Sequence, residues 1–196
     1  MTKIKLCGMQ REKHIEWANE AGCDFIGFVF APSRRQISRE VAADLRRRVN
    51  PAIAVVGVFV DEPVEHIIRI AEEGIIDLIQ LHGREDEAYL RALRSVCSLP
   101  IIKAVCNPHT TVVESSTADY ILLDGAKGGS GKMFDWRQAS GYDKPIFLAG
   151  GLHAGNLENA IRTVCPYAVD MSSGLEERGE KQRHLMVQAT AIAHAL

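Results

Sequence analysis

Eight short apolar runs recur along this chain, separated by segments with helical periodicity or by shorter polar segments. The runs are rich in Ile, Val and Phe, which favour β-strands, and they lie at residues 3–7, 24–30, 52–60, 77–82, 100–105, 119–124, 145–151 and 167–173. Continuous apolar strands separated by helices form a parallel sheet that is covered on its outer face. Eight such units fit a doubly wound sheet or a closed (β/α)8 TIM barrel, and the count favours the barrel.

The segments between the runs predict six helices, at residues 10–21, 38–49, 63–73, 85–97, 156–164 and 181–195. In the second helix, Val41, Leu45 and Val49 fall four residues apart behind Ser38, whose hydroxyl group can cap the first turn. Gly74 follows the third helix and can end it. The segments 107–118 and 137–144 are short, so we expect short or irregular helices after strands five and six.

The length of the chain fits a compact barrel. A chain of 196 residues provides about 25 residues for each unit, which is near the lower limit of the fold. We therefore expect one domain over residues 1–196. Gln80 and Lys103 interrupt apolar runs, and we expect both to point into the barrel toward its open end.

Composition and charge exclude several classes of protein. The formal net charge is −2 and the isoelectric point is near 6.4, which gives no indication of nucleic acid or a membrane surface as a partner. No apolar run approaches the ~20 residues of a membrane span, and the N-terminus shows no apolar signal core. The five cysteines are odd in number and lack CxxC spacing, so neither a disulfide framework nor a zinc site is expected. We expect a cytoplasmic protein.

Reactive side chains stand at the ends of several predicted strands, where the active site of a (β/α)8 barrel lies. Cys7 and Gly8 end the first run, Arg34 and Arg35 follow the second, and Asp124 ends the sixth. A cysteine by itself is most often a core residue. A thiol that shares a barrel mouth with a carboxyl group and paired arginines is a candidate for acid–base chemistry.

Glycine-rich loops follow the last three runs. The loops after runs seven and eight are the positions where many barrels hold a phosphate group. Small residues let backbone N–H groups approach the phosphate oxygens, and the N-terminus of the helix predicted at 156–164 adds positive potential. Tight strand-to-helix turns are the alternative, but two adjacent loops favour phosphate. The candidate phosphate-binding residues are Gly129, Ser130, Gly131, Gly150, Gly151, Ser172, Ser173 and Gly174. The first three follow run six, and their loop can wrap the same phosphate group or act as a lid.

Several segments between residues 7 and 176 resemble, in order, the motifs of the phosphoribosylanthranilate isomerase family: KIKLCGM, GFVFAPSRRQIS, VGVFV, IQLHG, ILLDG, GGSGKMFDW, FLAGGL and VDMSSGLE. The resemblance implies a (β/α)8 barrel that opens the ribose ring of N-(5′-phosphoribosyl)anthranilate and isomerises it to the 1-amino-1-deoxyribulose phosphate. This reaction is an Amadori rearrangement in tryptophan biosynthesis, and the resemblance implies neither a metal nor an organic cofactor. The implied partner is a small phosphorylated substrate, and we expect a monomer or a homodimer.

The same resemblance implies roles for individual residues. Asp124 is the general acid that protonates the ring oxygen to give an open Schiff base, and Cys7 is the general base that removes the C2′ proton to give an enolamine. Arg35 matches the position that holds the anthranilate carboxylate, whereas Arg34 is expected to be a bystander. A free thiol is only a few per cent ionised at neutral pH and burial raises its pKa, so Cys7 needs a nearby cation or aligned dipoles.

Two further candidates for substrate binding are open to more than one interpretation. Asp170 fits a hydrogen bond to the sugar, and it fits equally well a buried carboxylate that orders the loop after strand eight. His82 fits a substrate ligand, a helix cap or a packing residue. The departures from the family pattern are few and concern affinity more than reaction type; they are Gln36, Gly125, Ala126, Arg178 and Gln182.

Two other functions stay open. A non-catalytic phosphosugar-binding barrel would keep the glycine loops, but it does not need Cys7 and Asp124 at its mouth. A related aminoaldose isomerase of histidine biosynthesis should show two similar half-barrels with an Asp ending strands one and five. This chain carries Cys7 and Lys103 near those ends, and no half-repeat is visible in the sequence.

Overall fold

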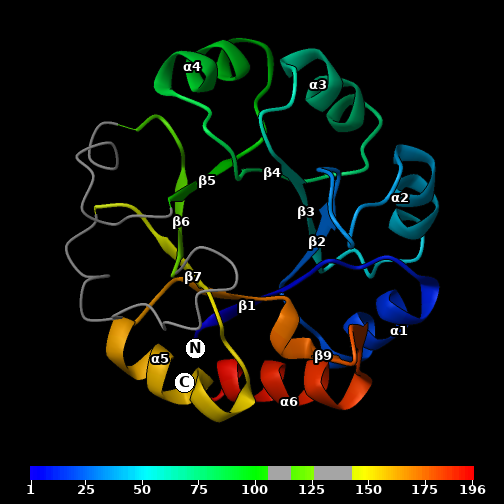
Figure 1. Ribbon diagram of the computed structural model, residues 1–196, viewed down its shortest axis with the longest axis vertical. Coiled ribbons are helices and arrows are strands. Elements are labelled where there is room, and N and C mark those ends of the chain that lie inside the picture. The colour runs from blue at the N-terminus through cyan, green and yellow to red at the C-terminus, as the bar shows by residue number, and fades with distance from the viewer. Residues whose placement is uncertain (106–115, 126–142) are drawn as a thin grey trace.

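Eight parallel strands pair in sequence order and close into a barrel in the computed structural model, which describes residues 1–105, 116–125 and 143–196. The first strand pairs with the second on one side and with the eighth on the other. A closed barrel confirms the predicted (β/α)8 TIM barrel and excludes the doubly wound sheet, which has open edges (Figure 1). The strands are β1 (Lys3–Cys7), β2 (Phe25–Val29), β3 (Ala54–Phe59), β4 (Leu78–Leu81), β5 (Ile101–Val105), β6 (Tyr120–Asp124), β7 (Ile146–Ala149) and β8 (Ala168–Met171).

The six predicted helices are all present, with their ends shifted by a few residues, and they surround the barrel (Figure 1). They are α1 (Glu12–Ala21), α2 (Arg39–Arg46), α3 (Val64–Glu72), α4 (Glu87–Val96), α5 (Ala154–Val164) and α6 (Arg183–His194). The short or irregular helices expected after strands five and six fall largely on residues 106–115 and 126–142, outside the described residues. Within the described ranges, none of the helices has the length and apolar character needed to cross a membrane.

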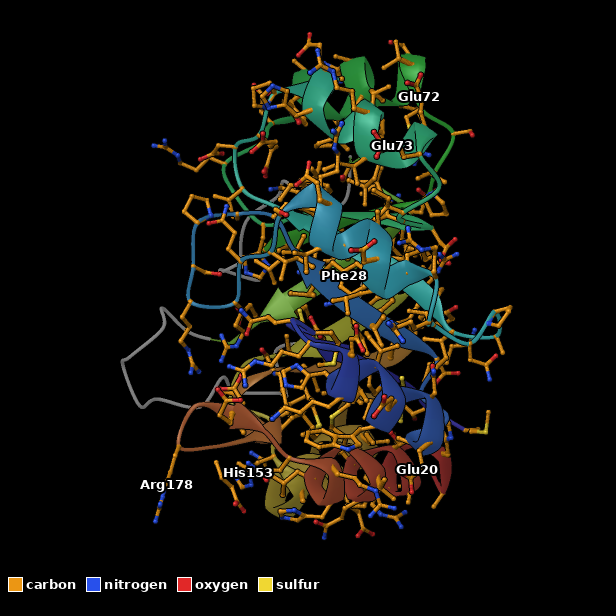
Figure 2. All side chains as sticks on the ribbon, turned by 90° about the vertical axis from the view of Figure 1, so that its right-hand side faces the viewer. Glu20, Phe28, Glu72, Glu73, His153 and Arg178 are labelled. Carbon is orange, nitrogen blue, oxygen red and sulfur yellow. The ribbon has the colours of Figure 1, made fainter. Side chains whose placement is uncertain are left out.

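A feature that the sequence did not indicate lies between β8 and α6. A 3-10 turn (Ser173–Leu175) leads into a small antiparallel hairpin, formed by β9 (Glu176–Glu177) and β10 (Glu180–Lys181). Gly179 closes the hairpin with a left-handed φ of 83°. Arg178, in the turn of this hairpin, extends away from the rest of the molecule (Figure 2).

The buried face of α2 differs from the prediction. Ser38 caps the helix as predicted, because its Oγ accepts a hydrogen bond from the N–H group of Val41 at 3.3 Å. The side chain of Val41 is nevertheless 41% exposed, whereas Ala42 and Leu45 are buried. The face toward the barrel is therefore set by residues three apart, and the prediction was wrong for Val41. Gly74 follows α3 with a left-handed φ of 67°, as its predicted role requires.

Alternation along the strands decides which side chains line the barrel. The inner apolar cluster consists of Phe25, Val56, Leu78, Ile102, Ala104, Leu122, Phe147, Ala149 and Ala168. Gln80 shares the inward face of β4 with Leu78, as predicted. Lys103 lies between Ile102 and Ala104 on β5 and therefore points outward, where its Nζ lies 2.6 Å from Oε2 of Glu85. The prediction that Lys103 enters the barrel was wrong.

Candidate active site

Cys7 ends β1 with its side chain inside the barrel, because Ile4 and Leu6 of the same strand belong to the outer core. Gly8 then adopts a left-handed φ of 85°, which turns the chain away from the strand. A Cβ at Gly8 would lie 2.5 Å from Cδ of Arg35, so glycine also leaves room for the arginine side chain. The Cys-Gly step therefore brings the thiol and Arg35 to the same part of the mouth.

Charged groups surround the thiol of Cys7. Lys5, two residues earlier on β1, is fully buried, and its Nζ donates a hydrogen bond to Oδ2 of Asp170 at 2.9 Å. On β2, a Cβ at Gly27 would lie 2.6 Å from Sγ of Cys7 and 3.2 Å from Nζ of Lys5. Burial raises the pKa of the Cys7 thiol, and the carboxylate of Asp170 adds to the rise, whereas the ammonium groups of Lys5 and Lys181 oppose it.

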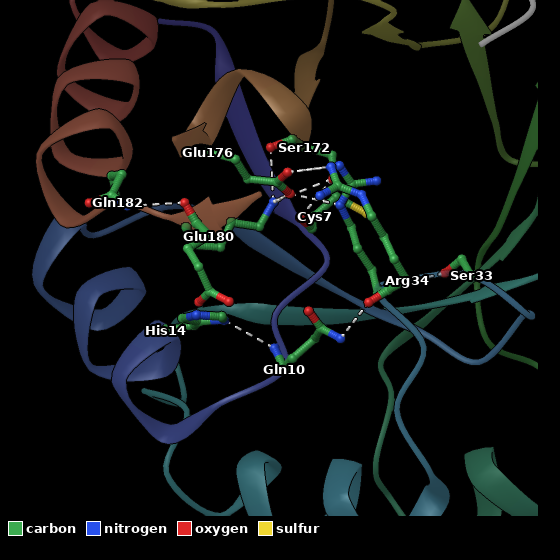
Figure 3. Close-up of polar contacts among 11 residues, drawn as sticks. Cys7, Gln10, His14, Ser33, Arg34, Ser172, Glu176, Glu180 and Gln182 are labelled. Atoms are coloured by element: carbon green, nitrogen blue, oxygen red, sulfur yellow. Dashed lines mark hydrogen bonds and ion pairs between the residues drawn. The ribbon is translucent and has the colours of Figure 1, made fainter. Parts of the chain in front are cut away.

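Glu176, at the start of β9, binds three cations at the mouth (Figure 3). Its Oε1 accepts hydrogen bonds from Nε of Arg35 at 2.7 Å and lies 3.0 Å from Nζ of Lys181. Its Oε2 accepts from Nη2 of Arg35 at 3.1 Å and also from Arg34. Burial alone would raise the pKa of Glu176, but the hydrogen bonds from Arg35 and Lys181 outweigh it and lower the pKa to about 2.

Arg34 and Arg35 both contact Glu176, which adds to the roles expected of them from the sequence. The Nε and Nη2 groups of Arg35 are engaged by Glu176, so its remaining N–H groups are the ones left to a ligand. Arg34, expected to be a bystander, shares the same carboxylate. Glu176 therefore orients both arginine side chains at the rim of the barrel.

Ser172 joins the hairpin to the end of β1. Its Oγ donates a hydrogen bond to the carbonyl oxygen of Cys7 at 3.1 Å, and its own carbonyl oxygen accepts from Nζ of Lys181 at 2.9 Å. Lys181 therefore connects Glu176 with Ser172, and Ser172 reaches the carbonyl oxygen of Cys7. The hydroxyl group of Ser172 is engaged in these contacts.

Asp124 ends β6 and shares the inward face of the strand with Leu122. Its Oδ2 lies 3.3 Å from Nε2 of His82, and Nδ1 of His82 lies 2.9 Å from Nε2 of Gln80. Nδ1 of His82 thus lies toward the amide of Gln80, and Nε2 is the ring nitrogen on the side of the carboxyl group. His82 therefore contacts the predicted acid, an arrangement that sequence analysis did not foresee.

The loops after β7 and β8 lie against each other. A Cβ at Gly174 would overlap the carbonyl oxygen of Leu152, so glycine is required for this contact. Gly150 and Gly151 adopt left-handed φ angles of 89° and 67°, and α5 begins directly after them with His153 as its N-cap. The structure thus brings together five of the predicted phosphate-binding residues, Gly150, Gly151, Ser172, Ser173 and Gly174; the other three, Gly129, Ser130 and Gly131, lie outside the described residues.

The mouth of the barrel therefore carries a buried thiol on β1, a carboxyl group on β6 and adjacent glycine loops after β7 and β8. In the part of the chain that the structure describes, no group of three or more His, Cys, Asp and Glu side chains is arranged to hold a metal ion. The closed parallel barrel and this set of side chains define a (β/α)8-barrel enzyme.

Comparison with known proteins shows which enzyme family this is. Residues 4–190 match the model of the family N-(5′-phosphoribosyl)anthranilate (PRA) isomerase. The chain belongs to this family, and it is an isomerase. It is 38% identical over 200 residues to the N-(5′-phosphoribosyl)anthranilate isomerase of Endomicrobium trichonymphae, and the alignment covers all of both chains.

Solved structures give the same result. The phosphoribosyl anthranilate isomerase of Thermus thermophilus is 33% identical and covers 99% of each chain with a TM-score of 0.89. A second phosphoribosyl anthranilate isomerase, solved with reduced 1-(o-carboxyphenylamino)-1-deoxyribulose 5-phosphate, is 31% identical and covers 100% of each chain with a TM-score of 0.86. The resemblance found in the sequence motifs is therefore confirmed.

Three charged residues of this part of the barrel, Lys5, Glu176 and Lys181, were not singled out from the sequence. Lys5 carried a usable signal, because it precedes Cys7 by two residues on one strand and must share its face. Glu176 stood in the VDMSSGLE motif, and Lys181 lay at the start of a predicted helix. Their convergence depends on the β9–β10 hairpin, which has no apolar pattern to reveal it.

Proposed function

We propose that the protein converts N-(5-phosphoribosyl)anthranilate to 1-(2-carboxyphenylamino)-1-deoxyribulose 5-phosphate, with Asp124 as general acid and Cys7 as general base. The observation that carries this proposal is the placement of a thiol on β1 and a carboxyl group on β6 in one barrel mouth, in a chain of this isomerase family. As an enzyme of tryptophan biosynthesis it acts in the cytoplasm on a small phosphorylated substrate. It works as one domain over residues 1–196, as a monomer or a homodimer.

The reaction begins at the ring oxygen of the ribose. The C1′–O bond breaks as Asp124 gives its proton to the oxygen, and the lone pair of the anthranilate nitrogen forms the open, protonated Schiff base. Nε2 of His82 lies 3.3 Å from Oδ2 of Asp124, and this contact restricts the orientation of the acid. The carboxyl group is open to the mouth, because 30% of its side chain is exposed.

The second step takes place at C2′. The thiolate of Cys7 removes the C2′ proton, and the electron pair of the C–H bond forms the C1′=C2′ double bond of an enolamine, which cancels the positive charge on nitrogen. The enolamine then becomes the ketone of the product. Oδ1 of Asp170 is buried and has no hydrogen-bond partner among the described residues, so it is positioned to accept a hydrogen bond from a sugar hydroxyl group.

The remaining groups bind the two ends of the substrate. The N–H groups of Arg35 that Glu176 leaves unoccupied hold the anthranilate carboxylate. The phosphate group lies against Gly150, Gly151 and the loop after β8, where the N-terminus of α5 adds positive potential. Gly129, Ser130 and Gly131 complete this site in the proposal.

A steady-state assay that follows the loss of phosphoribosylanthranilate fluorescence tests the proposal. We expect turnover of this substrate by the purified protein without added metal or cofactor. Binding of the substrate without its consumption would instead indicate a non-catalytic phosphosugar-binding barrel. Turnover of an aminoaldose of histidine biosynthesis in place of phosphoribosylanthranilate would indicate the related isomerase.

A further inference from the structure

Lys5 is a fully buried lysine whose side chain points into the barrel below the mouth. Burying an ammonium group is costly, and pairing it with a carboxylate rarely recovers more than an apolar pair of the same size would provide. A purely structural role therefore gives little reason for a charged residue here. Its neighbours in the barrel, Cys7 and Asp170, suggest a role in the chemistry of the site instead.

The position of Lys5 beside the sulfur is set by three strands. Cys7 follows Lys5 on the same face of β1, and Asp170 on β8 accepts the hydrogen bond from Nζ at 2.9 Å. Gly27 on β2 pairs with Cys7, and the missing side chain leaves the space that Sγ and Nζ fill together. The ammonium group is thus confined next to the thiol.

Lys5 stays charged in this environment. Burial lowers the pKa of its amine, but the charges of Asp170 and Cys7 outweigh this effect and the pKa is raised. Lys181 also acts on Cys7, but its ammonium group is shared between Glu176 and the carbonyl oxygen of Ser172. Lys5 is the cation whose Nζ fills the space at Gly27 together with Sγ of Cys7.

We propose that Lys5 is a positioning residue of the isomerisation: its ammonium group, held by Asp170, stabilises the thiolate of Cys7 that takes the C2′ proton. This inference rests on the proposed role of Cys7 as the base. Lys5 keeps its own proton throughout. The proton from C2′ ends on the sulfur of Cys7, and the charge of Lys5 is the same before and after the step.

The test replaces Lys5 with methionine, which keeps the length of the side chain and removes its charge. The ionisation of Cys7 is followed by the ultraviolet absorbance of the thiolate, as the difference between each protein and the same protein carrying Cys7→Ser. Loss of an adjacent cation should raise the ionisation midpoint by about 1–3 pH units. The kcat near neutral pH should fall by roughly 10- to 1000-fold, and its pH profile should move to higher pH by the same interval.

Lys103→Met is the matched control, because Lys103 also pairs with a buried carboxylate, that of Glu85, but on the outer face of the barrel. This variant should leave the ionisation midpoint of Cys7 unchanged. Asp170→Asn removes the anion that opposes the thiolate and should lower the midpoint. Opposite shifts in Lys5→Met and Asp170→Asn would distinguish a charge effect from a general loss of packing.

An unchanged midpoint in folded Lys5→Met would overturn the proposal. If Lys5→Met does not fold, the double variant Lys5→Met/Asp170→Asn replaces it, because it leaves no unpaired buried charge. Its midpoint should still rise, because Nζ of Lys5 shares the space beside Gly27 with Sγ of Cys7, whereas Asp170 accepts its hydrogen bond from Nζ. A raised midpoint with parental turnover would show that Cys7 is not the base. That result would contradict the proposed function and leave the charge coupling between Lys5 and Cys7 in place.

Discussion

Nε2 of His82 lies 3.3 Å from Oδ2 of Asp124, so the carboxyl group at the end of β6 is held by a histidine that directly follows β4. Gln80, inside the barrel, holds the other ring nitrogen of His82. The three side chains form a chain of contacts that runs from the barrel interior to the proposed acid. The side chain of Asp124 is therefore contacted from the barrel interior by side chains of the protein itself.

His82→Gln should lower kcat and leave KM nearly unchanged, because it removes the side chain that contacts Asp124. A polar contact worth about 0.5–1.5 kcal/mol, the range of an ordinary hydrogen bond, corresponds to a loss of roughly 2- to 13-fold. The measurement is steady-state kinetics of His82→Gln beside His66→Gln. His66 pairs with Glu62 on the surface, and its variant should behave like the parent. A rise in KM with parental kcat would assign His82 to substrate binding.

Gly151→Glu should raise KM strongly, because the new carboxylate would repel the phosphate group. The structure offers a close control in Gly74. Both glycines adopt a φ of 67°, and among the described residues a Cβ at either position meets no atom within 4 Å. Gly74→Glu therefore carries the same backbone strain at the end of α3, away from the mouth, and should leave KM unchanged. Equal KM values for the two variants would place the phosphate group elsewhere.

Arg35→Ala should weaken turnover of a substrate that carries the anthranilate carboxylate and spare an analogue that lacks it. A charged hydrogen bond is worth about 1.5–3 kcal/mol, so kcat/KM should fall by roughly 10- to 200-fold for the first substrate. The comparison requires the two substrates with one enzyme variant. Equal losses for both would show that Arg35 serves the fold, through Glu176, and not the carboxylate.

Glu176→Gln should destabilise the protein in a pH-dependent way. The pKa of Glu176 is lowered from 4.5 to about 2, so its contribution is fully present above pH 4.5 and is lost as the pH falls toward 2. At about 1.36 kcal/mol for each pH unit, the ion pairs contribute on the order of 3 kcal/mol. Urea unfolding of parent and variant across this range should show a difference that shrinks with acidification. A difference that stays constant would mean that the charge of Glu176 is not responsible.

The barrel could be predicted from the sequence because each of its eight strands is an apolar run, and a parallel strand buried on both faces leaves that pattern. For the same reason, the sequence did not show which side chains of β5 point into the barrel. Ile101, Ile102 and Ala104 are all apolar, so the run contains no alternation that shows which face Lys103 occupies. The buried face of α2 was predicted wrongly because Val41 is apolar but exposed, so its apolar side chain does not mark the face toward the barrel.

Among the candidate site residues, only those that stand at the ends of apolar runs could be picked out from the local sequence. Cys7 and Asp124 stand at strand ends, and the barrel fold brings all such ends to one mouth. The contact between His82 and Asp124 joins two strands that are not neighbours in the sheet, and no local pattern encodes it. The cations of Glu176 come from the loop after β2 and from a hairpin of two-residue strands, so their convergence needed the structure.

The kcat of Cys7→Ser shows whether the sulfur of Cys7 takes the C2′ proton. Only one atom changes, and a hydroxyl group is a far weaker base than a thiolate, so the variant should fold and should bind a product analogue like the parent. A positioned base contributes about 10²–10⁴-fold, and kcat should fall by at least this factor with little change in KM. Turnover near the parental value by folded Cys7→Ser would contradict the account and reduce the cysteine to a packing residue.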